Sequence, residues 1–128
     1  MNYINTLASQ MMDMYFVLDE SHSARPVCDE EWWEWYKNPE NRRVAEDYLF
    51  GNTLRISTIC NGLNSAISAS DPPLIFETMV FVKSEIIGQR LYATWDEAIA
   101  GHQEAVAELT NAIALPDDAN KFNIELES

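Results

Sequence analysis

The chain has 128 residues, of which 47% are hydrophobic, so its length and composition predict one folded domain and exclude a disordered chain. Its 21 Asp and Glu residues outnumber its 8 Lys and Arg residues, which gives a formal net charge of −13. This charge repels phosphates, so we expect no direct binding to nucleic acid or to a membrane. It favours a partner with a basic surface, unless the acidity serves only solubility.

The two cysteines and the absence of targeting signals predict a cytoplasmic protein. Cys28 and Cys60 lack CxxC spacing, which is typical of free thiols in a reducing compartment. The N-terminus has no basic segment followed by a continuous apolar stretch. No apolar run approaches the roughly 20 residues that a membrane span requires.

The first third of the chain predicts two helices and a strand. Residues 1–13 carry Ile4, Leu7, Ala8 and Met11 at helical spacing, which indicates an added amphipathic helix. That helix either caps the sheet or packs against a second copy, so a homodimer stays open. Residues 14–18 are short, apolar and partly β-branched, which predicts a strand, and a loop with Pro26 follows. A helix over 29–37 begins with acidic residues and ends before Pro39.

The middle of the chain predicts three more strands. Residues 44–50 alternate weakly, and Gly51-Asn52 is a turn leading into a strand over 53–60. After a polar loop at 61–73, residues 74–82 give the strongest strand signal. Because this strand is apolar on both faces, we expect it at the centre of the sheet.

The C-terminal part predicts one long helix and a tail. Thr94 and Glu97 form a capping box at the start of the helix. One apolar stripe then runs to about residue 114: Trp95, Ala98, Ile99, His102, Val106, Leu109 and Ile113. Residues 116–128 read as an acidic tail, or as an edge strand through the alternating Phe122, Ile124 and Leu126.

These elements predict a single α+β domain over residues 1–115. A small antiparallel sheet of about four strands packs against the long C-terminal helix, with extra helices at the N-terminus and at 29–37.

Several stretches carry a family resemblance. They are Asn41-Arg42-x-Val44-Ala45, Ile56-Ser57-Thr58, Asp71-Pro72-Pro73-Leu74-Ile75-Phe76-Glu77-Thr78-Met79-Val80-Phe81, Arg90-x-Tyr92-x-Thr94-Trp95-Asp96-Glu97-Ala98 and Gly101-His102. With these stretches in this order, the chain resembles a family of small phage and prophage accessory proteins from about residue 15 to 106. The resemblance implies a phage gene product in the cytoplasm of the host bacterial cell, and it supplies no biochemical activity.

The chain departs from that family's pattern at two turns. The family carries a Leu-Asp-His turn where this chain has Leu63-Asn64-Ser65, so the Asp and His are both absent. The family also places a glycine pair where Val82-Lys83 stand. A polar or metal-binding site at the first turn, if the family has one, is therefore lost here.

The helix at 29–37 provides the first candidate site. Four carboxylates and one tryptophan are expected on its outer face: Asp29, Glu30, Glu31, Glu34 and Trp33. Trp32, Trp35 and Tyr36 share another face and can fill the core. A tryptophan surrounded by carboxylates is a plausible anchor for a basic partner, and the alternative is that Trp33 covers a neighbouring loop.

The loop at 61–73 provides the second candidate site. Its polar residues, with two charges from neighbouring elements, are candidates for lining a ligand pocket: Asn61, Asn64, Asp71, Glu77 and Arg90. Glu77 lies in the most apolar strand, where an unpaired charge is costly, so we expect Arg55 of the preceding strand to pair with it.

Other reactive side chains read as structural. His102 on the apolar stripe is expected to be a core histidine, Cys60 to be packed, and His22 to have no partner. We find no phosphate-binding loop, nucleophile elbow or metal-ligand spacing, and therefore predict no cofactor and no metal.

Two functions follow from these observations. The first is a protein that binds a host protein with a basic surface, as a counter-defence inhibitor of a CRISPR-Cas or other antiviral complex, at the point where that complex binds nucleic acid. The alternative is a binder of, or an enzyme acting on, a small ligand such as a nucleotide signal. We favour the first, which is not an enzyme.

Overall fold

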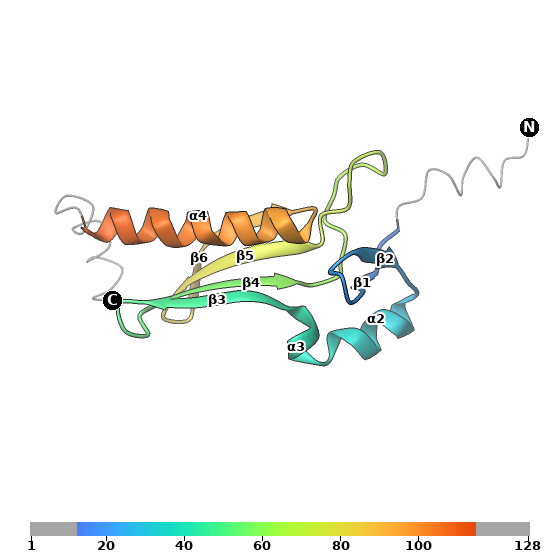
Figure 1. Ribbon diagram of the computed structural model, residues 1–128, viewed down its shortest axis with the longest axis horizontal. Coiled ribbons are helices and arrows are strands. Elements are labelled where there is room, and N and C mark those ends of the chain that lie inside the picture. Colours follow the sequence, from blue (N-terminus) through green and yellow to red (C-terminus); the bar gives the residue numbers. More distant parts are fainter. Residues whose placement is uncertain (1–12, 115–128) are drawn as a thin grey trace, which may run out of the picture.

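A four-stranded antiparallel meander is the centre of the computed structural model, which describes residues 13–114 (Figure 1). The strands lie in chain order, each hydrogen-bonded to the next. They are β3 (Arg43–Leu49), β4 (Leu54–Cys60), β5 (Phe76–Val82) and β6 (Glu85–Tyr92). The strongest strand of the sequence therefore lies inside the sheet, as predicted.

The alternation of side chains along β5 shows how the sheet separates its two faces. Phe76, Thr78, Val80 and Val82 are buried on one face, while the residues between them are only half-buried on the other. The register places Glu77 opposite Ile59 of β4 and opposite Leu91 of β6. Since successive side chains of a strand point to opposite faces, this register fixes which residues share a face.

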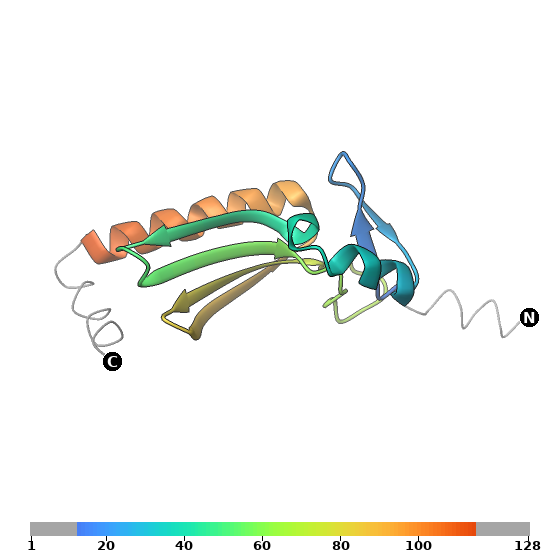
Figure 2. The same ribbon diagram turned by 90° about the horizontal axis from the view of Figure 1, so that it is seen from below.

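The helix α4 (Trp95–Ala114) covers the face that carries the buried residues of β5 (Figure 1). Its apolar stripe completes two clusters of buried side chains. The first is Phe16, Cys60, Ile75, Phe76 and Ala98, and the second is Leu54, Ile56, Val80, Val82 and Ala105. In the described chain no helix crosses the opposite face of the sheet (Figure 2).

Smaller elements gather at one end of the sheet (Figures 1 and 2). They are β1 (Phe16–Leu18), β2 (Ala24–Pro26), α2 (Asp29–Tyr36) and α3 (Pro39–Arg42). β1 and β2 form a separate antiparallel pair. Gly62 joins this end to β4 with φ +69°, and a Cβ there would collide with the carbonyl oxygen of Phe16.

The predicted α+β class is confirmed, with four antiparallel strands on a long C-terminal helix. Two strands and one short helix were missed. No element was predicted over the residues of β6, and the predicted loop at 21–27 contains β2. The predicted strand at 14–18 pairs with β2 instead of joining the main sheet. The N-terminal helix predicted over residues 1–13, apart from its last residue, and the tail at 116–128 lie outside the described residues.

Candidate functional site

The helix α2 is short and acidic, and its sequence explains both features. Asp29, Glu30 and Glu31 occupy its first turn, where carboxylates interact favourably with the free N–H groups of the helix. The helix stops at Tyr36, and Asn38 then accepts a hydrogen bond from the N–H of Glu40 to start α3. This arrangement holds α2 at the end of the sheet, beside the chain that leaves β4.

The aromatic residues of α2 divide between an inner and an outer face. Trp32 points inward, where its indole Nε1–H donates to the carbonyl oxygen of Asn61 at 2.9 Å and its ring lies 4.7 Å from that of Tyr36. Trp33 is 53% exposed, although its ring lies 6.1 Å from Tyr36. The Trp33 side chain is therefore exposed to solvent on one side, while its ring packs against the other aromatic rings of α2.

The carboxylates around Trp33 are all exposed, and cations neutralise only part of them. Glu31 pairs with Arg25, and Glu34 pairs with Lys37 at 2.8 Å. Within the described chain neither Asp29 nor Glu30 forms an ion pair. The outer face of α2 thus combines a large exposed aromatic side chain with net negative charge.

The second candidate set does not form one pocket. Asn64 fixes its own loop, because its Oδ1 accepts from the N–H of Ala66 at 2.8 Å and its Nδ2 donates to the carbonyl oxygen of Asp13 at 3.0 Å. Asp71 lines a separate hollow of about 390 Å³ beside Tyr92. The structure brings together only Asn61 and Glu77, whose Nδ2 and Oε1 atoms lie 3.1 Å apart.

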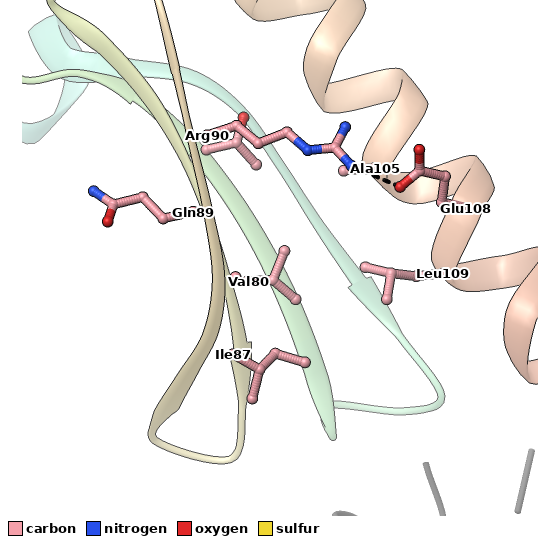
Figure 3. Close-up of a pocket in the computed structure, with 9 residues that line it drawn as sticks. Val80, Ile87, Gln89, Arg90, Ala105, Glu108 and Leu109 are labelled. Atoms are coloured by element: carbon pink, nitrogen blue, oxygen red, sulfur yellow. Dashed lines mark hydrogen bonds and ion pairs between the residues drawn. The ribbon is translucent and has the colours of Figure 1, made fainter. Parts of the chain in front are cut away.

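Glu77 and Arg90 lie on opposite faces of the sheet. Arg90 is opposite Thr78 and faces α4, where its Nη2 lies 2.7 Å from Oε2 of Glu108. It lines a groove of about 280 Å³ between β6 and α4 (Figure 3). The groove walls are mostly apolar and include Val80, Ile87 and Leu109.

The predicted pairing of Glu77 with Arg55 is wrong. Arg55 lies opposite Phe81 rather than Glu77, so its Nε instead donates to Oε1 of Glu46 on β3 at 3.2 Å. The Tyr48 hydroxyl and the Arg55 guanidinium together hold the pKa of Glu46 below its usual value. Glu77 accepts from Asn61 on one oxygen and from Gln89 Nε2 on the other, at 2.8 Å.

His102 is a core histidine, as predicted, and is 3% exposed. Its Nδ1 lies 2.7 Å from the hydroxyl of Thr58, and its Nε2 lies 2.7 Å from Oδ2 of Asp47. The expectation that His22 has no partner is wrong, since its ring stacks on Trp95 with centroids 3.6 Å apart. Both histidines are therefore engaged in contacts that hold elements together.

Sequence reasoning missed Gln89 and the role of Asn61, because both depend on β6 and on the register of β5. No group of three or more His, Cys, Asp or Glu side chains among the described residues is placed to hold a metal ion. None of the helices in that part of the chain is long and apolar enough to cross a membrane. Comparisons with family models, curated proteins and solved structures found no match.

Proposed function

We propose that this protein acts by binding another protein through the outer face of α2. The observation that supports this most directly is the exposure of Trp33, at 53%, among the carboxylates of the same helix. Tryptophan is enriched among the few residues that carry most of the energy of an interface. An exposed tryptophan that already rests on packed rings loses little conformational freedom when it is buried by a partner.

The charge of the chain indicates the kind of partner. A net charge of −13 attracts a basic surface over long range and raises the rate of encounter with it. More specifically, we propose that the partner is a host protein that uses a basic surface to bind nucleic acid. The chain would then act as a phage counter-defence inhibitor. The resemblance to phage accessory proteins supports this choice of partner class.

The reactive side chains of the described chain favour binding over catalysis. Thr58 and Cys60 are each 0% exposed, so neither hydroxyl nor thiol can meet a substrate without local unfolding. His102 uses both ring nitrogens for contacts inside the protein. We therefore propose that the protein is not an enzyme.

A pull-down with matched aromatic variants tests the proposal. The tagged protein, Trp33→Ala and Phe50→Ala are each incubated with lysate of the bacterial host. Phe50 is the control, because it is 44% exposed and lies in the β3–β4 turn, at the other end of the sheet. We expect the same host protein to be retained by the parent and by Phe50→Ala, with affinity lowered at least about tenfold for Trp33→Ala. Retention of no host protein, or equal retention by Trp33→Ala, would contradict the proposal.

A further inference from the structure

The face of the sheet opposite α4 is a second exposed surface, which we call the open face. Its members follow from the register of the strands. They are Arg43, Glu46, Tyr48, Arg55, Ser57, Ile59, Glu77, Met79, Phe81, Ile86, Gln89 and Leu91. Tyr48, Ile86 and Leu91 are 51%, 57% and 40% exposed, so much of the apolar area on this face is in contact with water.

The open face carries four charged side chains, and three of them form ion pairs, because Arg43 and Arg55 both pair with Glu46. Arg55 pairs with Glu46, and its guanidinium also lies 5.2 Å from the centre of the Phe81 ring. Glu77 differs from Glu46, because none of the ion pairs formed by the described residues includes it. The open face therefore has one carboxylate that lacks a cation.

The neutral amides of Asn61 and Gln89 hold that carboxylate in place. Each donates to a different oxygen of Glu77, at 3.1 and 2.8 Å. A carboxylate offers about four acceptor positions, so each oxygen of Glu77 keeps further capacity for a donor. The group is thus fixed in orientation while its negative charge stays unneutralised.

The surroundings of Glu77 suit the stem of a long side chain. Its cross-strand neighbours are Ile59 and Leu91, and Met79 follows it on the same face of β5. Long cationic side chains lay their methylene groups along apolar surface while the charged end stays polar. An arginine that reaches Glu77 across this surface would therefore meet both a carboxylate and apolar neighbours.

Asn61 connects this part of the open face to α2. Its carbonyl oxygen accepts from the indole of Trp32, and its side-chain amide donates to Glu77. The inner tryptophan of α2 and the unneutralised carboxylate are thus held by one residue. α2 and the chain that leaves β4 lie at the same end of the sheet (Figure 2), so a partner that docks on α2 lies near this end of the open face.

We propose that Glu77 binds an arginine of the protein partner that docks on α2, an inference that rests on the proposed function. Arginine fits better than lysine, because its planar guanidinium donates two parallel N–H groups to the two oxygens of one carboxylate. It is also more weakly hydrated, which suits a site flanked by Ile59, Met79 and Leu91. The charge of −13 disfavours a second copy of this chain as the occupant.

A titration with a small arginine probe tests the site without the partner. Nitrogen-15-labelled protein is titrated with N-acetyl-arginine amide, and the side-chain NH2 signals of Asn61 and Gln89 are followed by NMR. We expect both signals to shift and to saturate, because their acceptor Glu77 gains a cation. In Glu77→Gln, which keeps the shape and removes the charge, affinity falls at least about tenfold. Glu104→Gln on α4, which covers the other face of the sheet, is the matched control and keeps the response.

Further measurements separate this inference from the proposed function. Trp33→Ala should keep the arginine response while it loses the host protein, and Glu77→Gln should fold normally by its amide spectrum. If the signals do not shift, or shift equally in Glu77→Gln, the inference is overturned while the role of Trp33 stands. A dimer in light scattering that Glu77→Gln converts to a monomer would also overturn it, because a second copy would then occupy the open face. A response to N-acetyl-lysine amide as strong as that to arginine would overturn the choice of arginine.

Discussion

The imidazole of His102 joins three elements through two hydrogen bonds. We assign its proton to Nε2, because the carboxylate of Asp47 on β3 can only accept, which leaves Nδ1 to accept from Thr58 on β4. The hydroxyl of Thr58 also bonds that of Thr78 on β5, so α4 is tied to three strands. Although Asp, His and Thr stand in the order of a catalytic relay, the burial of Thr58 makes the relay structural.

The thiol of Cys60 predicts how stability depends on pH. Burial raises its pKa to about 12, whereas an exposed thiol titrates near pH 8.5. The unfolded chain therefore releases this proton first as the pH rises. The protonated Cys60 thiol contributes its full stabilisation of the folded protein below about pH 8.5. This stabilisation is lost as the pH approaches about 12, by up to about 1.4 kcal/mol per pH unit.

Urea unfolding at pH 8 and pH 10 measures this effect in matched cysteine variants. We expect Cys60→Ala to be less stable than the parent at pH 8, because it leaves a cavity, but to lose about 1–2 kcal/mol less between the two pH values. Cys28→Ala removes the exposed cysteine and should keep the pH dependence of the parent. If the parent and Cys60→Ala lost equal stability between pH 8 and pH 10, the pKa of the Cys60 thiol would be the same in the folded and the unfolded chain.

At the scale of the element, the start of α4 depends on the capping box. The hydroxyl of Thr94 accepts from the N–H of Glu97 at 3.1 Å, and the Glu97 carboxylate accepts from the N–H of Thr94 at 3.2 Å. We expect Thr94→Ala to lower the free energy of unfolding by about 1 kcal/mol, measured by urea titration. Thr110→Ala is the control, because Thr110 is exposed near the other end of the same helix and alanine favours helix there. Equal losses in both variants would argue against a specific role for the cap.

The elements that the sequence predicted are those with local signals. The capping box at Thr94 and the apolar stripe after it are enough to predict α4. A run of apolar residues is enough to predict β5 at the centre of the sheet. β6 was missed because its register shifts between Val80 and Phe81, so the sequence of this edge strand does not alternate cleanly. β2 was missed because its pairing depends on a turn in which His22 adopts φ +64°, a conformation uncommon for histidine.

The candidate site was predictable where it depends on a single helix. The spacing of the tryptophans was enough to place Trp33 outside the core. The partner of Glu77 was not predictable, because adjacency of two strands does not fix their register, and a different register puts Arg55 beside Phe81. The sequence also could not show that Arg90 and Glu77 lie on opposite faces of the sheet. The face on which Arg90 lies depends on the strand β6, which was not predicted.

At the scale of the whole molecule, the two faces of the sheet have different roles. The face under α4 holds both buried clusters, so its residues supply most of the folding energy. Both Trp32 of α2 and Glu77 of the open face are hydrogen-bonded to Asn61, so α2 and the open face are neighbours at one end of the sheet. Stability and proposed binding can therefore be altered separately by mutation.

The net charge of −13 predicts that salt acts on folding and on binding with opposite signs. Carboxylates that repel one another destabilise the compact chain, and salt screens them, since the Debye length falls from about 10 Å at 0.1 M to about 3 Å at 1 M. We expect thermal melts between 0.05 and 0.5 M NaCl to show a rise of roughly 4 °C, which corresponds to about 1 kcal/mol for a domain of this size. The same screening weakens attraction to a basic partner, so host-protein capture should decrease over this range.

Salt is expected to raise the melting temperature but to lower capture of the host protein. The salt series therefore tests whether the binding surface is mainly charged or mainly apolar. If capture depended on the apolar part of the open face alone, salt would leave it unchanged or strengthen it. A double charge reversal, Asp29→Lys with Glu30→Lys, sharpens the distinction, because neither carboxylate forms an ion pair within the described residues. This variant should capture less host protein than the parent at low salt. The two proteins should converge as salt rises. A variant that captured the partner as well as the parent at low salt would place the binding energy in Trp33 and the open face rather than in the acidic residues of α2.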